Sequence, residues 1–356
     1  MFFKKRKSLG VDISDYSIEL ISLEEPKTYP RLLAMSGTVL DPAIFSGGEV
    51  INKEELKNAL KEIVKNPKFG KIETNYAVFS LPESESFILT VSLPEEIKER
   101  EIPEYVRSQA IQSFPYPIEE LYFDYRVLDE EIFMAAATRD TINSYLEVIN
   151  GAGLKVLAIE TESMSLGRAL LKEKGPLMIL DIGAKVSNFI ICDEGRLKKS
   201  FSLPIAGENF TKAISEKLDI SFDEAETLKR KAGLNPIPEE GRVFLILQKE
   251  ISGIVEEIKK LEEYFYDKTG KKIEKIILVG GSASLLHLAE YLAENLLKLV
   301  EIGDPWDIMN IDILNKEEYI DEAYKTNPII YATSLGSALR GLDSELEKTE
   351  INLLPR

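Results

Sequence analysis

The segment LGVDISDYSIELISL, residues 9–23, decides the fold. Two apolar runs flank the polar break SDYS, residues 14–17, and this pattern predicts a strand, a tight turn and a second strand. Asp12 stands near the end of the first strand, just before the turn. A turn of small polar residues in this place points backbone N–H groups to one side, where an anion can bind. The segment therefore predicts a phosphate-binding hairpin.

The same layout recurs in LMILDIGAKVSNFIICD, residues 177–193. Here the first strand leads to Asp181, the turn is AKVS, and a return strand follows at 196–204. Two such hairpins predict an α/β fold of two duplicated lobes around a cleft, each lobe gripping one side of a polyphosphate. Because an aspartate at a strand end can hold a metal-bound water beside a phosphate, Asp12 and Asp181 are the candidate metal residues.

Two further segments are candidates for contacts with a nucleotide. In ILVGGSASL, residues 277–285, Gly280 and Gly281 follow a strand and precede a helix expected from about Ser284, so the backbone can approach a ligand closely. The alternative is a plain strand-to-helix turn, and the segment is not the G-x-G-x-x-G of a dinucleotide fold. Glu226 and Lys229 lie three apart on one helix face, and either bind a ribose or base edge or form a surface ion pair.

Composition excludes several classes of protein. At 356 residues the chain is too long for one ordinary core, and no run of about 18 apolar residues predicts a transmembrane segment. A single cysteine, Cys192, allows no internal disulfide and fits a reducing cytosol, and a single histidine, His287, argues against histidine metal sites and triads. The net charge of -17 argues against a nucleic-acid partner. The basic residues 4–7 either touch anionic lipid or form a frayed, soluble N-terminus.

Prolines punctuate both ends of a stretch of strands and a helix, residues 81–155, which predicts an inserted α+β subdomain. The resulting domain assignment has five parts: a first-lobe core at 8–80, completed by 156–173 and 330–343; the insert at 81–155; a second-lobe core at 174–210, completed by 273–329; a helical subdomain at 211–272; and a tail at 344–356.

The tail ends in INLLPR, residues 351–356, after the polar stretch SELEKTE. Chain termini are usually polar because nothing buries them, so Ile351, Leu353 and Leu354 require an explanation. Either the tail folds back over a nearby apolar patch, or it is a docking peptide.

The hairpins LGVDISDYS and LDIGAKVSN, together with ILVGGSASL, resemble the phosphate and adenosine motifs of the actin-like ATPase superfamily, and ATSLGSALRG resembles its lobe-connecting helix. Residues 114–128, FPYPIEELYFDYRVL, and 149–170 are similar to the PilM family of type IV pilus assembly proteins. This family resembles the division protein FtsA in fold, with an extra subdomain in the first lobe. The expected fold is therefore an actin-like ATPase fold with an inserted α+β subdomain.

The resemblance implies that the chain binds ATP with Mg²⁺. The implied nucleotide residues are Asp12, Ser14, Asp15, Tyr16, Ser17, Asp181, Gly183, Ala184, Lys185, Ser187, Gly207, Glu208, Glu226, Lys229, Gly280, Gly281 and Ser282. Two positions depart from the family pattern: Ser14 stands where glycine is usual, and Glu19 where lysine is frequent. Both changes are expected to weaken nucleotide binding, because glycine eases a tight turn and a carboxylate repels phosphate.

The resemblance also implies a place on the cytoplasmic side of the inner membrane and a partner, the membrane protein PilN. The family binds the N-terminal I-N-L-L-P peptide of PilN in a groove between the first-lobe core and the insert. The tail here has the same letters, Ile351, Asn352, Leu353, Leu354 and Pro355. We therefore expect it to dock in its own groove, in competition with PilN, or in that of a neighbouring copy.

The leading expectation is a cytoplasmic, nucleotide-binding scaffold of a pilus, secretion or competence complex, with at most weak ATPase activity. The alternatives are a turnover ATPase or small-molecule kinase, and an FtsA-like filament-forming division protein. Glu160 and Glu162 are the nearest candidates for a hydrolytic base, although a solvated turn is the preferred interpretation of both.

Overall fold

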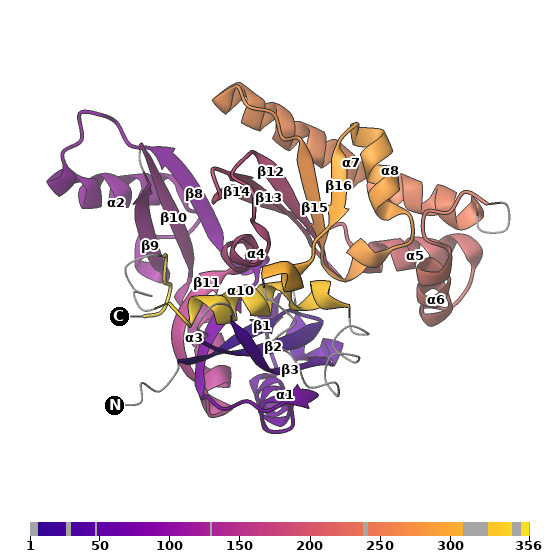
Figure 1. The fold of residues 1–356 in the computed structure, drawn as a ribbon, viewed down its shortest axis with the longest axis horizontal. Helices are drawn as coiled ribbons and strands as arrows, with labels where there is room; N and C mark the ends of the chain where they lie inside the picture. Colours follow the sequence, from indigo (N-terminus) through magenta and orange to yellow (C-terminus); the bar gives the residue numbers. More distant parts are fainter. Residues whose placement is uncertain are drawn as a thin grey trace. The chain divides into compact units, whose positions relative to one another are not determined.

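The computed structural model describes residues 6–25, 30–46, 48–128, 130–237, 241–308, 327–343 and 350–355. The chain divides into two units, residues 1–171 with 304–356, and residues 172–303 (Figure 1). Residues 1–5, which include Lys4 and Lys5 of the basic N-terminal cluster, and 344–349 of the tail lie outside the described part. No helix in the described part is long and apolar enough to cross a membrane.

The first unit contains a sheet in the strand order β11-β7-β1-β2-β3-β6. The strands are β1 (Lys7–Ile13), β2 (Ser17–Glu24), β3 (Arg31–Val39), β6 (Phe69–Gly70), β7 (Tyr76–Leu81) and β11 (Lys155–Thr161). The antiparallel pairing of β1 with β2 confirms the predicted hairpin, and it places Asp12 opposite Glu19. β7 runs parallel to both β1 and β11, which leaves β11 at the edge of the sheet.

Helices cover both faces of this sheet (Figure 1). They are α1 (Lys53–Lys65), α3 (Arg139–Gly151), α4 (Glu162–Leu170) and α10 (Ala332–Arg340), with the short pair β4 (Phe45–Ser46) and β5 (Glu49–Val50) nearby. α10 packs on α4 and β1 at backbone contact. A Cβ on Gly10 would lie 1.8 Å from the Ser334 carbonyl oxygen, and one on Gly336 would lie 1.9 Å from that of Ser165. Small residues therefore fix the position of α10.

A buried cluster beneath α10 contains Trp306, which packs with Ile21, Tyr331 and Leu335. This packing places residues 304–308 in the first unit, whereas the sequence assigned them to the second lobe. The indole is 5% exposed, so the short segment has its own anchor in the first-unit core.

The insert forms a separate small sheet in the order β8-β10-β9, covered by α2. Its elements are β8 (Phe87–Ser92), α2 (Ile102–Ser113), β9 (Leu121–Leu128) and β10 (Glu131–Thr138). α3 was assigned to the insert, but it packs mainly on α1 and β11 of the core. The Tyr145 ring of α3 lies 4.9 Å from the Phe79 ring of β7, which ties this helix to the larger sheet.

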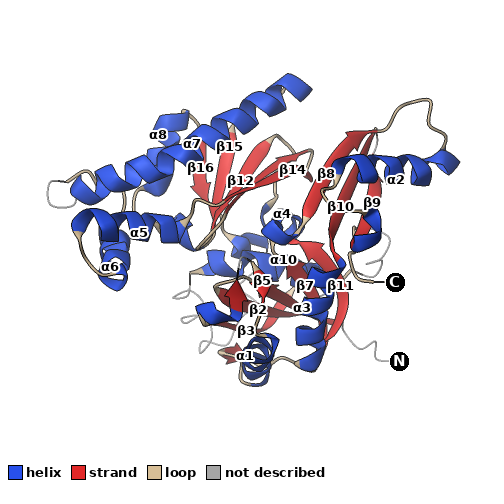
Figure 2. Cartoon of the chain, turned by 180° about the vertical axis from the view of Figure 1, so that it is seen from behind, coloured by secondary structure: helices blue, strands red, loops and turns tan. Residues whose placement is uncertain are grey.

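The second unit repeats the topology of the first, with the strand order β14-β13-β12-β15-β16. Its strands are β12 (Leu177–Ile182), β13 (Ser187–Asp193), β14 (Arg196–Leu203), β15 (Lys275–Val279) and β16 (Leu299–Ile302). Its helices are α5 (Gly207–Leu218), α6 (Phe222–Ala232), α7 (Gly241–Thr269) and α8 (Leu288–Leu296), seen together in Figure 2. In both units an antiparallel three-strand meander is followed by two parallel strands, which confirms the predicted duplication.

One predicted boundary is wrong. The helix after Gly281 was expected from about Ser284, but residues 281–284 form a short 3-10 helix and α8 begins at Leu288. His287, in left-handed backbone conformation at φ 61°, separates the two.

Candidate functional site

In the second unit, the start of α5 lies on the second hairpin. The backbone N–H of Gly207 donates to the Gly183 carbonyl at 3.1 Å, and that of Glu208 donates to the Ala184 carbonyl at 2.7 Å. The hairpin turn is closed by Gly183 N–H donating to Val186 at 3.0 Å. Two predicted parts of the nucleotide site are therefore adjacent.

The glycine turn after β15 joins the same place. Gly280 has a φ of 83°, and a Cβ there would lie 2.2 Å from Asp181 Oδ1, so only glycine fits. The Ser282 hydroxyl donates to the Gly183 carbonyl at 3.2 Å. Asp181, Gly183, Gly280 and Ser282 thus lie together, and we call this cluster the cradle.

Lys229 of α6 is an anchor within this cradle. Its Nζ donates to the Gly207 carbonyl at 2.9 Å and to Thr211 Oγ1 at 2.8 Å, and it pairs with Glu226 at 2.7 Å. Burial is the main cause that lowers the pKa of Lys229. The Glu226–Lys229 pair is therefore a partly buried connection between α5 and α6 rather than a surface ion pair.

The carboxyl of Glu226 makes the second unit sensitive to acid. Burial would raise its pKa, but hydrogen bonds from Lys229, Thr211 and Arg230 outweigh burial and lower the pKa to about 2. Its stabilising contribution is complete above the usual pKa of 4.5 and is lost as the pH falls toward 2. We expect Glu226→Gln to be less stable than wild type at neutral pH. The difference in free energy of unfolding should vanish as the pH approaches about 2.

Urea denaturation at a series of pH values, monitored by hydrogen exchange in α5 and α6, measures the difference in stability between wild type and Glu226→Gln. Glu216→Gln is the matched control, since Glu216 forms only an exposed ion pair with Lys212. A difference between wild type and Glu226→Gln that is constant over the whole pH range would contradict the prediction.

The first hairpin has the same backbone closure as the second, with Ser14 N–H donating to the Ser17 carbonyl at 2.9 Å, but it adds hydrogen bonds of a side chain. The Ser14 hydroxyl accepts hydrogen bonds from the backbone N–H groups of Tyr16 at 3.2 Å and Ser17 at 3.0 Å. It also donates to the Ser17 carbonyl at 3.2 Å. The N–H groups of Tyr16 and Ser17 are therefore already hydrogen-bonded within the turn, whereas Gly183, at the corresponding position of the second hairpin, has no side chain that could bond such groups.

A pair of buried carboxylates lies beneath this turn. Asp12 and Glu19 are both 8% exposed and stand opposite each other on β1 and β2. Burial, and secondly the charge of Asp12, raise the pKa of Glu19 well above its usual range. Asp12 belongs to the first unit and Asp181 to the second, and a magnesium ion held by both stays a prediction. The described residues contain no cluster of three or more acidic, histidine or cysteine side chains arranged for a metal.

The tail lies beside β9 and the edge strand β11 of its own chain (Figures 1 and 2). We call the place where its residues are buried the groove. Ile351 and Leu353 are each 1% exposed, and Leu354 and Pro355 are half-buried. Leu353 N–H donates to the Ile159 carbonyl at 2.9 Å, so the tail adds to the open edge of the sheet.

Asn352 gives the groove its most specific polar contacts. Its Oδ1 accepts from the backbone N–H of Ile159 at 3.0 Å and from that of Leu354 at 3.0 Å. The backbone N–H of Asn352 donates to Asp124 Oδ2 of β9 at 2.9 Å. Because the side chain serves core and tail together, the position selects an asparagine.

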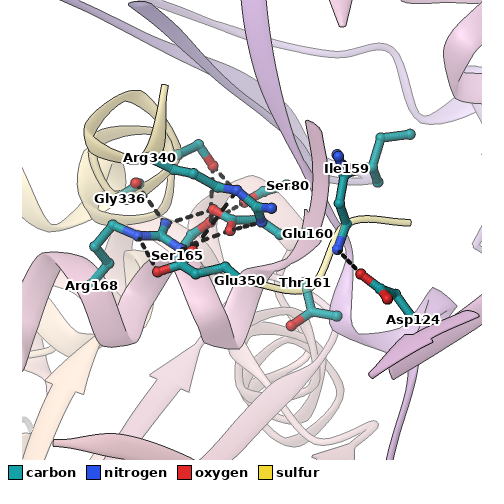
Figure 3. Close-up of polar contacts among 12 residues, drawn as sticks. Ser80, Asp124, Ile159, Glu160, Thr161, Ser165, Arg168, Gly336, Arg340 and Glu350 are labelled. Carbon is teal, nitrogen blue, oxygen red and sulfur yellow. Dashed lines mark hydrogen bonds and ion pairs between the residues drawn. The ribbon is translucent and has the colours of Figure 1, made fainter. Parts of the chain in front are cut away.

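Four charged residues meet where the tail enters the groove (Figure 3). Glu160 is fully buried, and it accepts from Arg168 at 2.7 and 2.8 Å and from Arg340 at 2.6 Å. Arg168 also pairs with Glu350, the residue before Ile351. Burial would raise the pKa of Glu160, but the charges of Arg168 and Arg340 outweigh it and lower that pKa.

The interpretation of Glu160 as part of a solvated turn was therefore wrong. Glu160 lies at the end of β11, inside the protein and held by two arginines, so it is neither a hydrolytic base nor part of a solvated turn. Glu162, at the start of α4, accepts a hydrogen bond from the backbone N–H of Glu83. Arg340 could have signalled this cluster, since it is the single charge in the small and apolar helix ATSLGSALR.

Comparison with known proteins bears on the family and the fold. The family model described as type IV pilus assembly protein PilM matches residues 10–342. A solved structure of a PilM–PilN type IV pilus biogenesis complex aligns with a TM-score of 0.78 and 23% identity, over 94% of this chain and 98% of that chain. MreB5 of Spiroplasma citri bound to AMPPNP aligns with a TM-score of 0.53 and 13% identity, over 91% and 99% of the two chains. These likenesses establish the actin-like ATPase fold.

Two curated relatives are division proteins. FtsA of Bacillus subtilis is 27% identical over 109 residues, which is 30% of this chain and 25% of that protein. FtsA of Staphylococcus epidermidis is 24% identical over 194 residues, 48% of this chain and 41% of that protein. The chain thus matches less than half the length of each FtsA relative. The family match extends over nearly the whole fold, and the chain belongs to the PilM family of type IV pilus assembly proteins.

Proposed function

We propose that this chain is a cytoplasmic scaffold, peripheral to the inner membrane, that binds an I-N-L-L-P peptide of a PilN-type membrane protein in the groove between β9 and β11. The observation that carries the proposal is the burial of the tail between β9 and β11. A segment with these letters is buried there through Ile351 and Leu353, and its residue Asn352 hydrogen-bonds Ile159 of β11. A groove that orders this peptide in its own chain has the chemistry to bind it from another.

The peptide-binding proposal is tested by removing the tail. We expect a protein truncated after Ser344 to bind a synthetic peptide of residues 344–356 with about micromolar affinity, a binding free energy of roughly −8 kcal/mol. The full-length protein is expected to bind it far more weakly, because its own tail fills the groove. Calorimetric titration of both proteins measures the difference, and Trp306 fluorescence serves as a folding control. A truncated, folded protein that binds no peptide would remove the proposal.

We also propose that the chain binds ATP with Mg²⁺, chiefly through its second unit. The cradle of Asp181, Gly183, Gly280 and Ser282 fits a nucleotide, because its glycines bring backbone atoms close to a ligand. Bound Mg·ATP would supply the polyphosphate for this cradle. Asp12 and Asp181 are the proposed residues for the magnesium ion. The first hairpin contributes little, since Ser14 hydrogen-bonds the N–H groups of its own turn and Glu19 offers phosphate no positive charge.

The weakness of the first hairpin is a testable consequence. We expect Ser14→Gly combined with Glu19→Lys to raise the affinity for Mg·ATP by about tenfold, because a charged hydrogen bond contributes about 1.5–3 kcal/mol. Asp12 would give the new lysine a counter-charge. Titration of a fluorescent ATP analogue measures the change, and Glu104→Lys, on exposed α2, is the control for net charge. Equal affinity in wild type and the double variant would contradict the prediction.

α10 offers a route by which nucleotide and peptide would influence each other. Its residue Ser334 packs directly on Gly10 of β1, and its residue Arg340 binds Glu160 beside the groove. Coupling requires that the peptide prefer one nucleotide state. We propose that Mg·ATP changes the affinity of the truncated protein for the peptide, and equal affinities with and without Mg·ATP would end this part of the proposal.

A further inference from the structure

The charge cluster at the entrance of the groove is balanced only when the tail is in place. Its four members are two acids, Glu160 and Glu350, and two arginines, Arg168 and Arg340. If the tail leaves, Glu160 alone faces both arginines, and one positive charge stays uncompensated. With the tail in place the Arg340 side chain is 1% exposed, so its charge is compensated by carboxylates rather than by water.

The side chain of Arg340 is the one most affected if the carboxylate of Glu350 is absent. Its Nη1 donates to Glu160, but its Nε and Nη2 are buried without a hydrogen-bond partner among the described residues. The Nε lies 3.8 Å from Glu350 Oε2. A buried guanidinium with unsatisfied donors favours a carboxylate on this side.

The other contacts of the tail do not depend on the residue before Ile351. Arg126 donates to the backbone carbonyl of Glu350, and the remaining polar contacts involve Asn352 or backbone atoms. Any peptide with the letters I-N-L-L would make them. The carboxylate of Glu350, which accepts from Arg168 Nε at 3.3 Å, is what distinguishes this tail from other such peptides.

We infer that the groove selects an extended peptide with an acidic residue immediately before Ile-Asn-Leu-Leu, and that the chain's own tail is its resident occupant, held by Glu350. The inference rests on the proposed peptide-binding function. A peptide with a neutral or basic residue at this position leaves Arg168 and Arg340 undercompensated and displaces the tail poorly. Glu350 is thus a specificity-determining residue that closes the groove of each chain with its own tail.

The test uses the full-length Leu353→Asp variant, in which a charge replaces the buried anchor and the tail leaves the groove. Three synthetic peptides of residues 344–356 are titrated into it: the native sequence, E350Q and E347Q. The last two have the same net charge. We expect E350Q to bind about tenfold more weakly than the native peptide, since charged hydrogen bonds are stronger than neutral ones. E347Q is expected to bind like the native peptide.

The outcomes separate this inference from the proposed function. Equal binding of the native and E350Q peptides overturns the inference and leaves peptide binding intact. Equal losses for E350Q and E347Q also overturn it, because the effect is then one of net charge. If a folded Leu353→Asp protein binds none of the three, the proposed function fails as well.

A second variant does not depend on the folding of the first. In the full-length Glu350→Gln protein the tail is a weaker internal competitor, so a labelled native peptide is expected to bind about tenfold more tightly than it binds wild type. Fluorescence anisotropy measures both affinities. Identical affinities for the two proteins would overturn the inference.

Discussion

Glu160→Gln is expected to lower the free energy of unfolding of the first unit by about 3–5 kcal/mol, the range for removing one partner of a buried ion pair. The substitution conserves the shape of the side chain but removes its charge. Arg340 and Arg168 then share one carboxylate, Glu350, at a site where Arg340 is 1% exposed. The loss should therefore come from uncompensated charge rather than from a cavity.

The single tryptophan makes this loss measurable in the first unit alone. Trp306 is the only tryptophan of the chain and is buried in the first-unit core, so its fluorescence follows the urea denaturation of that unit. Glu147→Gln is the control, because Glu147 forms an exposed ion pair with Lys53 and should change stability by less than about 1 kcal/mol. If Glu160→Gln and Glu147→Gln have the same stability, the buried cluster contributes nothing special.

The pH dependence of the same cluster has a definite sign. The pKa of Glu160 is lowered in the folded protein, so its contribution is present above the usual pKa of a glutamate and is lost as the pH falls below it. Glu160→Gln removes this acid dependence.

Gly10→Ala is expected to destabilise the first unit by about 3 kcal/mol, the upper end for adding a methyl group to a packed core. The new Cβ would lie 1.8 Å from the Ser334 carbonyl oxygen and 2.5 Å from the Ala338 backbone nitrogen. Both atoms are backbone atoms of α10, so no side chain can move aside and the helix itself must shift. Because Ala338 and Leu335 pack near Trp306, the shift should also change the emission of the folded protein.

Gly167→Ala is the matched control in the same unit. Its new Cβ would meet only Leu171 Cδ1, at 3.5 Å, which is an ordinary contact. Within helix α4, replacing glycine by alanine should be neutral or stabilising by up to about 1 kcal/mol. Gly10→Ala that is as stable as Gly167→Ala would mean that α10 does not depend on close packing against β1.

The sequence by itself determined the features that depend on neighbouring residues. Alternation of apolar residues around SDYS and AKVS was enough to predict both hairpins, and their repetition was enough to predict a duplicated fold. The letters INLLP, together with the resemblance to the PilM family, identified the tail as a candidate peptide. These signals are local, since strand, turn and peptide motifs each depend on only a few consecutive residues.

The tertiary structure decided which of these residues are available. Ser14 was a departure from a pattern in the sequence, and only the folded turn shows its hydroxyl accepting from the N–H groups of Tyr16 and Ser17. Glutamate is a residue type usually found at the surface, yet Glu160 is buried, because Arg340, 180 residues later, packs against it. The tail's place beside β9 and β11 likewise depends on contacts between distant segments. Such contacts arise from the packing of whole elements, and no local pattern of residues specifies them.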